Sequence, residues 1–284
     1  MGVPGAATTG GGAALTGGRP VPWWLRLFFV INVVQDAGIG LSGWVSPEHI
    51  VIPLKGLTPL NARFVASLYL GGGVVIVAAA LARRAVDTRL ALFSFLAITV
   101  LVLLMTLVYW SRFTVDGVPR LWMITYVADP VISSVALVSL GLLGSALPGR
   151  HRLTGIFIGQ SALLGVLGLA LLVASPAILD AWPWALTPLL ARVYAAFFLA
   201  FALGAGLAAY ERRPQAVMGF ALGSLTLLIL SLGTSVVHLA RFDHGPGRWI
   251  WFTVHVAGIA ALTLVVLALR NAERVRPQIE VVAA

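Results

Sequence analysis

Eight long apolar runs follow one another along the chain, separated by short polar segments. They cover residues 23–44, 59–81, 90–110, 121–143, 153–173, 188–209, 216–238 and 249–270. An α-helix needs about 20 residues to cross a hydrocarbon core of ~30 Å, and each run has about that length. The pattern therefore predicts an all-α polytopic membrane protein with eight transmembrane helices.

One motif in this pattern occurs twice. The segment 57–63 (LTPLNAR) returns as 186–192 (LTPLLAR), and the offset between the two prolines is 188 − 59 = 129 residues. Arg112-Phe113 and Arg241-Phe242 match at the same offset. A tandem duplication of four helices explains these matches, and an even number of helices gives both copies the same orientation in the membrane. We therefore expect two side-by-side four-helix bundles in parallel orientation.

The apolar runs and the repeat together divide the chain into four parts. We expect a flexible N-terminal tail at 1–20, a first membrane repeat at 21–145, a second at 150–271 and a C-terminal tail at 272–284. The N-terminal tail holds seven glycines and no apolar run. Such a segment buries too little surface to offset the entropy lost on ordering.

Each copy of the repeated motif marks the start of a helix, because threonine is a good N-cap and proline suits the first helical position. The links in front of the motif, 46–58 and 175–187, are expected to lie in the membrane interface. Trp182 and Trp184 would then sit at headgroup level. In the middle of the second run, Gly71-Gly72-Gly73 provides small residues that let neighbouring helices approach closely.

Composition supports the membrane assignment and excludes several functions. The chain is 60% apolar and 10% charged, with a mean hydropathy of +0.98, whereas soluble domains have about 25% charged residues. The absence of cysteine excludes disulfides, thiolate metal sites, iron–sulfur clusters and thiol redox chemistry. The formal net charge is +9. The basic residues lie mostly in short loops between apolar runs, so they indicate membrane topology and not nucleic-acid binding.

The positive charges also predict an orientation. In the eight-helix arrangement, 12 arginines lie on the side of both termini, and seven lysines and arginines lie on the other side. Positive residues prefer the cytoplasmic face. We therefore expect a multi-pass protein of the cell (inner) membrane with both termini cytoplasmic.

Acidic and amide side chains interrupt the first and fourth runs. Asn32, Gln35 and Asp36 occupy about one turn, and Asp129 stands immediately before Pro130. Asp36 and Asp129 each lie about eight residues from the end of a run, or ~12 Å deep at the helical rise, so they are expected to share a layer. Intramembrane carboxyls usually face the bundle interior and mark functional sites.

The second copy lacks both acids and carries histidines instead. His238 and His255 occupy the positions of Tyr109 and Tyr126. One reading is a bis-histidine haem, because haem in helical bundles is held by inward histidines on facing helices. The tyrosines of the first copy favour the other reading, a packing and hydrogen-bonding layer that lines a pocket.

Arg63 and Arg192 fall in the first turn of their helices, where the helix dipole disfavours a cation by ~0.3–1 kcal/mol. An anionic partner would relieve this cost, either Glu48, Asp180 or Asp36, or a lipid phosphate. Alternatively, both arginines anchor their helices at the interface.

The polar turns after the third and seventh runs carry further candidates. Arg112 and Arg241 are placed to reach helix-terminal carbonyls, and Asp243 beside His244 suggests an acid–base dyad. These turns contain no matching nucleophile motif, so a plain charged turn is the alternative. All four side chains are retained as candidate ligand-binding residues on the outer face.

The four-helix unit, with the segment 62–71 (ARFVASLYLG) opening its second helix and Arg-Phe closing its third, resembles the DoxX-like family of small membrane proteins. The resemblance implies a four-helix fold for each copy. Some members of that family belong to quinone-linked oxidoreductase systems. The tandem arrangement departs from the family pattern, so neither partners nor stoichiometry carry over.

Three functional hypotheses follow. The first is a non-enzymatic accessory or binding protein with an outward-facing polar pocket for a lipid, quinone or similar amphipathic ligand, and with no cofactor. The second is a small-solute transporter or permease that uses Asp36 and Asp129 as a proton or cation relay. The third is a redox subunit with quinone or haem. The expected partners are the lipid bilayer and either other membrane subunits or a second copy of the chain.

Overall fold

The structure is a computed structural model, and it describes residues 18–54, 57–113, 118–143 and 149–282. Within these ranges the side chains of residues 118, 119, 121 and 273–282 are not described. Most of the predicted N-terminal tail and Lys55 lie outside the described residues. All regular elements in the described part are helices, apart from two isolated β-bridges.

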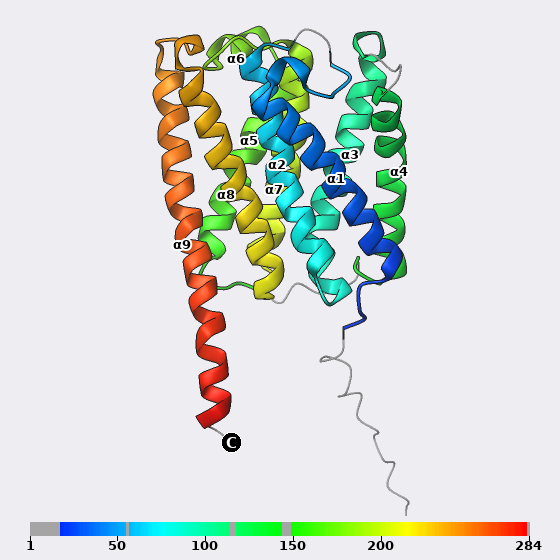
Figure 1. Cartoon of the computed structure of the whole chain (residues 1–284). Coiled ribbons are helices and arrows are strands. Elements are labelled where there is room, and N and C mark those ends of the chain that lie inside the picture. Colours follow the sequence, from blue (N-terminus) through cyan, green and yellow to red (C-terminus); the bar gives the residue numbers. More distant parts are fainter. Residues whose placement is uncertain (1–17, 55–56, 114–117, 144–148, 283–284) are drawn as a thin grey trace, which may run out of the picture.

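Eight helices are long and apolar enough to cross a membrane, which confirms the predicted polytopic α-helical class. They are α1 (Trp23–Val45), α2 (Pro59–Leu81), α3 (Arg89–Val108), α4 (Val118–Ser139), α5 (Thr154–Val173), α7 (Pro188–Ala208), α8 (Pro214–Val237) and α9 (Pro246–Val282). The ends of the described chain lie on one side of the molecule, which we call the terminal side (Figure 1). The opposite side is the loop side.

The short elements connect these helices. On the loop side lie η1 (Pro47–His49), η3 (Trp110–Arg112), α6 (Pro176–Ala181) and η4 (Leu239–Arg241), and on the terminal side lies η2 (Ala85–Thr88). Helix α9 continues to Val282, past the end of the apolar run at 270. The segment predicted as a C-terminal tail is therefore largely helical.

The predicted helix starts at the repeated motif are confirmed. The Thr58 hydroxyl accepts a hydrogen bond from the Asn61 backbone N–H at 3.3 Å, and Thr187 accepts one from Leu190 at 3.3 Å. Pro59 and Pro188 are the first helical residues. Proline is favourable there because the first N–H groups of a helix have no intrahelical acceptor.

The packing of the helices differs from the two separate bundles expected from the sequence. Helix α1 packs on α2 and α5 packs on α7, as expected within each half. The main remaining contact of α2, however, is with α8, and α7 packs on α3, while α2 and α3 barely touch. The eight helices therefore form one body in which each half of the chain reaches into the other.

Small residues explain the close approach of α2 and α8. A Cβ added at Gly71 would lie 2.7 Å from the Leu227 Cβ, and one added at Gly223 would lie 2.7 Å from the Gly71 carbonyl oxygen. Lipid tails are as apolar as leucine, so helices associate in membranes largely through such tight packing. The prediction that Gly71 permits a close helix contact is confirmed, and its partner helix belongs to the other half of the chain.

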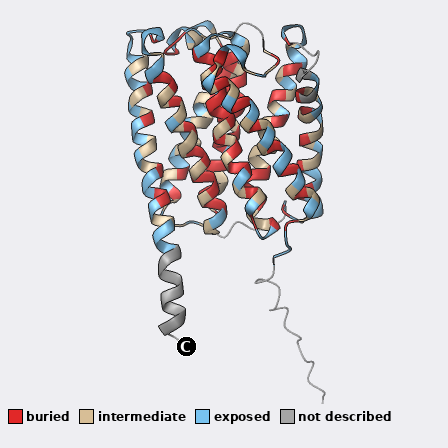
Figure 2. Ribbon diagram, viewed as in Figure 1, coloured by how far each residue is buried: buried red, intermediate tan, exposed pale blue. Residues whose placement is uncertain are grey.

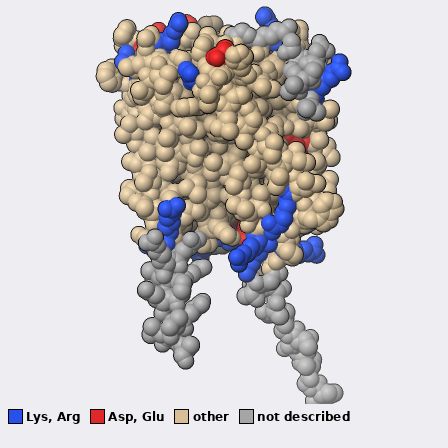
Figure 3. All heavy atoms as spheres, viewed as in Figure 1, with Lys and Arg blue, Asp and Glu red and all other residues tan. Residues whose placement is uncertain are grey.

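Buried residues concentrate on the central helices. Most of α2 and α7 is buried, whereas α5 and α9 lie at the periphery and expose apolar side chains (Figure 2). Lysines and arginines gather at the two ends of the molecule, and a largely uncharged band separates them (Figure 3). This distribution is that of a multi-pass membrane protein.

Trp182 and Trp184, which the sequence predicts at headgroup level, are buried inside the protein. Trp182 is 8% exposed and Trp184 is 3% exposed. Both pack against Trp251, and the Trp184 indole N–H donates to the Asn61 side-chain oxygen at 2.7 Å. An internal acceptor on α2 makes burial of this indole favourable, and the link sequence alone gives no sign of that acceptor.

Charged side chains join two turns on the terminal side. Glu211 is fully buried and accepts hydrogen bonds from the Arg213 backbone N–H at 2.9 Å and from the Arg213 Nε at 2.8 Å. The Arg213 Nε also lies 3.9 Å from an Asp87 carboxylate oxygen in η2. This network joins the α2–α3 link to the α7–α8 link on the terminal side.

Candidate functional site: an acid-lined cavity between the helices

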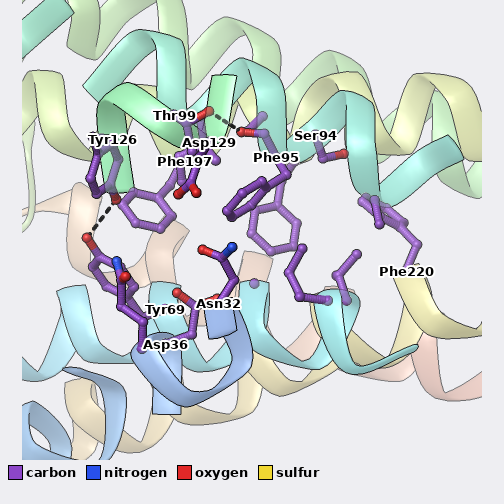
Figure 4. A pocket seen from close by; sticks show the side chains of 18 residues that line it. Asn32, Asp36, Tyr69, Ser94, Phe95, Thr99, Tyr126, Asp129, Phe197 and Phe220 are labelled. Carbon is purple, nitrogen blue, oxygen red and sulfur yellow. Dashed lines mark hydrogen bonds between the residues drawn. The ribbon is translucent and has the colours of Figure 1, made fainter. Parts of the chain in front are cut away.

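A cavity lies between α1, α2, α3, α4, α7 and α8. Asp36 on α1 and Asp129 on α4 both line it and point toward it (Figure 4). Asp36 is 7% exposed and Asp129 is 4% exposed. The two acids that the sequence predicts at similar depth therefore line one cavity.

Helical spacing explains how α1 brings several polar groups to the cavity. Asn32 and Asp36 lie four residues apart and therefore face the same side of the helix, and Gln35 completes the polar turn. The Asn32 amide N–H donates to the Phe28 carbonyl at 3.0 Å. The same amide group faces the Asp129 carboxyl across the cavity (Figure 4).

Two tyrosines close the cavity on the loop side of the acids. The Tyr69 and Tyr126 hydroxyls are hydrogen-bonded at 2.8 Å, and the Trp122 indole N–H donates to the Tyr69 oxygen at 3.3 Å. Beyond them lies a small apolar cavity that shares Tyr69 and Phe197 with the main one. The acids are thus separated from the loop side by a hydrogen-bonded aromatic layer.

The remaining wall is mostly apolar and aromatic. Phe95, Phe197, Phe201 and Phe220 line it together with smaller side chains. The empty space between the lining residues amounts to about 600 Å³ including the open side, and the centre of a water-sized molecule can occupy about 50 Å³ of it. A single water needs ~10–15 Å³ measured in this way, so the cavity has room for a few waters or a small polar group.

No lysine, arginine or histidine is among the residues that line this cavity, and neither acid forms an ion pair with any described residue. An isolated carboxylate in an apolar interior is costly. The carboxyls therefore either carry protons or neutralise a cation that enters the cavity.

Arg63 and Arg192 lie outside the cavity, in a layer at the loop-side helix ends. The Arg63 guanidinium donates to the Trp44 carbonyl at 3.0 Å and lies 2.7 Å from the His238 Nε2. Arg192 donates to the Tyr109 hydroxyl at 2.6 Å. Neither pairs with a carboxylate in the part of the chain that the structure describes, so the expected acidic partners are wrong.

These two contacts occupy corresponding positions in the two halves. Each arginine reaches the end of the third helix of the other half, and the residues it meets, Tyr109 and His238, stand 238 − 109 = 129 residues apart. Each arginine also donates to a carbonyl 19 residues before it. The arginines thus join the two halves on the loop side.

The contacts of the histidines do not fit a bis-histidine haem. Both ring nitrogens of His255 have partners, the Trp251 carbonyl at 2.9 Å and the Ser231 hydroxyl at 2.8 Å. His238 lies against Arg63, and burial together with Arg63 and Arg241 lowers the pKa of His238. The described residues contain no cluster of three His, Cys, Asp or Glu side chains suited to a metal ion.

The other loop-side candidates are not brought to the cavity. Arg112 and Arg241 are exposed residues that end η3 and η4. Asp243 and His244 are exposed, and the contact made by the His244 ring is with Arg248, at 3.3 Å. The geometry gives no support to an acid–base dyad at this turn.

Sequence reasoning missed several cavity residues. Tyr69, Thr99 and Gly72 all line the cavity, and polar or small residues within apolar runs were the available signal for them. Phe197 and Phe220 come from α7 and α8. A phenylalanine can occupy any apolar position of a membrane helix. Only the packing of the two halves therefore identifies these two as cavity residues.

The fold and this site define a class: a polytopic α-helical membrane protein with an acid-lined cavity inside its membrane-spanning region. No protein-family model, curated protein or solved structure matches the chain. The resemblance to the DoxX-like family therefore stays a prediction, and the function has to be argued from the cavity itself.

Proposed function

We propose that this protein is a transporter or permease in which Asp36 and Asp129 form a binding centre for protons or a cation. The observation that carries the proposal is the presence of two buried carboxyls in one cavity without a basic residue in its lining. These carboxyls can release their protons at a low cost in free energy only if a cation takes the place of the protons. Intramembrane acids of proton-driven transporters serve this role.

A second hollow supports a route between the acids and one side of the membrane. It shares Val75, Ala91 and Phe220 with the acid-lined cavity, and it is also lined by Asp87 and Gln215 near the terminal side. The Asp87 carboxyl and the Gln215 amide at its far end can hydrogen-bond water, and the carboxyl can also exchange a proton with it. The residues shared by the two spaces form the wall between them.

The small volume of the cavity favours this function over the binding of a whole lipid or quinone within it. Pockets for drug-sized ligands occupy ~300–1,000 Å³, whereas the space open to water-sized molecules here is about 50 Å³. A proton, a small cation or a small charged group fits this space.

Charge movement after a pH jump tests the proposal without a known substrate. Protein in liposomes adsorbed on a sensor is exposed to a step in pH, and we expect a transient current as protons reach the intramembrane acids. Asp36→Asn and Asp129→Asn should each reduce the transient, and the double variant should remove it. Asp180→Asn, at an exposed acid of α6, is the matched control. An unchanged transient in the double variant would remove both acids from the mechanism.

We also propose that the chain arose by duplication of a four-helix unit and that it lies in the cell membrane. The paired contacts α2–α8 and α7–α3 and the matching arginine contacts support a duplication whose two copies became interlocked. The excess of arginine on the terminal side supports cytoplasmic termini in the cell membrane.

A further inference from the structure

We infer that the acid-lined cavity binds a lipophilic organic cation, an amine or quaternary ammonium with an apolar tail, which reaches the acids from the bilayer between α1 and α4. The inference rests on the proposed function, because it names the cation that exchanges with protons at Asp36 and Asp129. Charge, wall chemistry and access each limit the class of ligand.

The charge of the site selects against neutral and anionic ligands. Two carboxyls face the cavity, and no basic side chain lines it. A ligand that replaces their protons must bring positive charge, because two uncompensated carboxylates in an apolar interior would be strongly destabilised.

The walls favour an organic cation over a metal ion. Divalent calcium or magnesium requires six or more oxygen ligands in close array, but most of this lining is aromatic or aliphatic. The rings of Phe95 and Phe197 lie near the acids (Figure 4), and Phe201 also lines the cavity. Aromatic faces attract alkylammonium groups by cation–π interaction and also cover their methyl groups.

Access is available from the side of the molecule. Helices α1 and α4 both line the cavity but barely touch each other, since α1 packs on α2 and α4 packs on α3. In Figure 3 an acidic residue is visible at the middle of the uncharged band, in the region where Figure 1 shows α1 beside α4. A small cationic head fits the cavity, and its apolar tail remains among the lipid chains.

The other two sides are less suited to such a ligand. Toward the loop side, the Tyr69–Tyr126 hydrogen bond closes the cavity. Toward the terminal side, Val75, Ala91 and Phe220 form a wall that the cavity shares with the hollow near Asp87. An amphipathic cation is already concentrated in the bilayer, so the side opening is its shortest route.

The test compares three probes that share one tail and differ in head charge: radiolabelled octyltrimethylammonium, octanol and octyl sulfate. Binding is measured with the protein in lipid nanodiscs, and empty nanodiscs correct for partitioning. We expect saturable binding of octyltrimethylammonium alone, with weaker binding as protons compete at lower pH. Asp36→Asn and Asp129→Asn should each weaken it by about tenfold or more, as expected when a buried charge pair loses one partner. Asp180→Asn should leave it unchanged.

A steric variant tests the cavity without altering its charge. A Cβ at Gly72, which lines the cavity, would meet nothing within 4 Å, so Gly72→Leu is expected to fill the space while keeping both acids. Gly38→Leu is the matched control, because Gly38 is exposed on α1 and also has nothing within 4 Å of an added Cβ. Gly72→Leu should lose probe binding, and Gly38→Leu should retain it.

The outcomes separate this inference from the proposed function. Cation binding that is lost in the acid variants and in Gly72→Leu supports the inference. If the pH-jump transient depends on the acids but the cation binds no better than octanol, the inference is overturned and the proton-binding site stands. Equal cation binding to the wild type and to the double acid variant also overturns it, whatever the transient shows.

Discussion

At the scale of single residues, the two halves of the chain form corresponding arginine contacts with different side chains. Arg192 donates to the Tyr109 hydroxyl, and Arg63 contacts the His238 ring in the corresponding place. A tyrosine hydroxyl accepts a hydrogen bond from arginine over the whole physiological pH range. A histidine does so only while it is neutral, so the second contact is sensitive to acid.

His238 should therefore give the protein an acid-sensitive stability. Its pKa is lowered in the native state by burial and by Arg63 and Arg241, so the unfolded chain binds a proton more readily. As the pH falls below about 6.5, the usual value for histidine, stability should decrease until the pH passes below the lowered native pKa. Above about 6.5 this contribution is fully present.

Thermal unfolding of the detergent-solubilised protein over a pH series measures this effect. His238→Tyr, which copies the Arg192–Tyr109 contact, should flatten the acid limb of the profile. His244→Gln, at an exposed histidine, should leave the limb as it is. An acid limb of the same slope in His238→Tyr would show that another group causes it.

At the scale of helices, close packing at glycine decides which elements touch. Gly71 on α2 and Gly223 on α8 bring the two backbones together, and neither position has room for a Cβ. Gly159 on α5 is different, because an added Cβ there meets nothing within 4 Å. The same residue type thus has a packing role in one helix and none in another.

Gly223→Ala should destabilise the protein by about 1–3 kcal/mol, the usual cost of overpacking a tight contact. Gly159→Ala should be neutral or slightly stabilising, since alanine is the better helix former by about 1 kcal/mol. The midpoint of thermal unfolding of each variant in the same detergent checks both expectations. Equal midpoints for the two variants would contradict the glycine-mediated contact.

At the scale of the whole molecule, the two halves depend on each other. Helices α2 and α7 are the most buried, and each packs extensively on a helix from the other half. The cavity likewise combines residues from α1 to α4 with residues from α7 and α8. A half that lacks its counterpart would therefore expose its tightest packing surface and an incomplete cavity.

Expression of separate halves tests this dependence. A chain ending at residue 145 and one beginning at 150 are each expected to aggregate or be degraded when produced alone. Co-expression should recover a 1:1 complex that co-purifies through a tag on either half. Two stable, independently purified halves would instead support the separate bundles expected from the sequence.

The sequence by itself determined the features that depend on local physics. Hydrophobic run length defined eight membrane helices, Thr58 and Thr187 marked two helix starts, and helical spacing put Asn32 and Asp36 on one face. Each of these follows from a few consecutive residues and their cost in lipid or at a helix end. The shared depth of Asp36 and Asp129 followed from the same counting.

Only the tertiary structure decided which helices touch and what surrounds the acids. Hydropathy cannot select a neighbour in a membrane, because every lipid-facing apolar surface resembles every other one and association depends on shape. The exchange of contacts between halves, the burial of Trp184 on Asn61 and the placement of Phe197 and Phe220 in the lining of the acid-lined cavity all follow from that shape. The chain sequence supplied the two acids, and the packing of both halves made them one site.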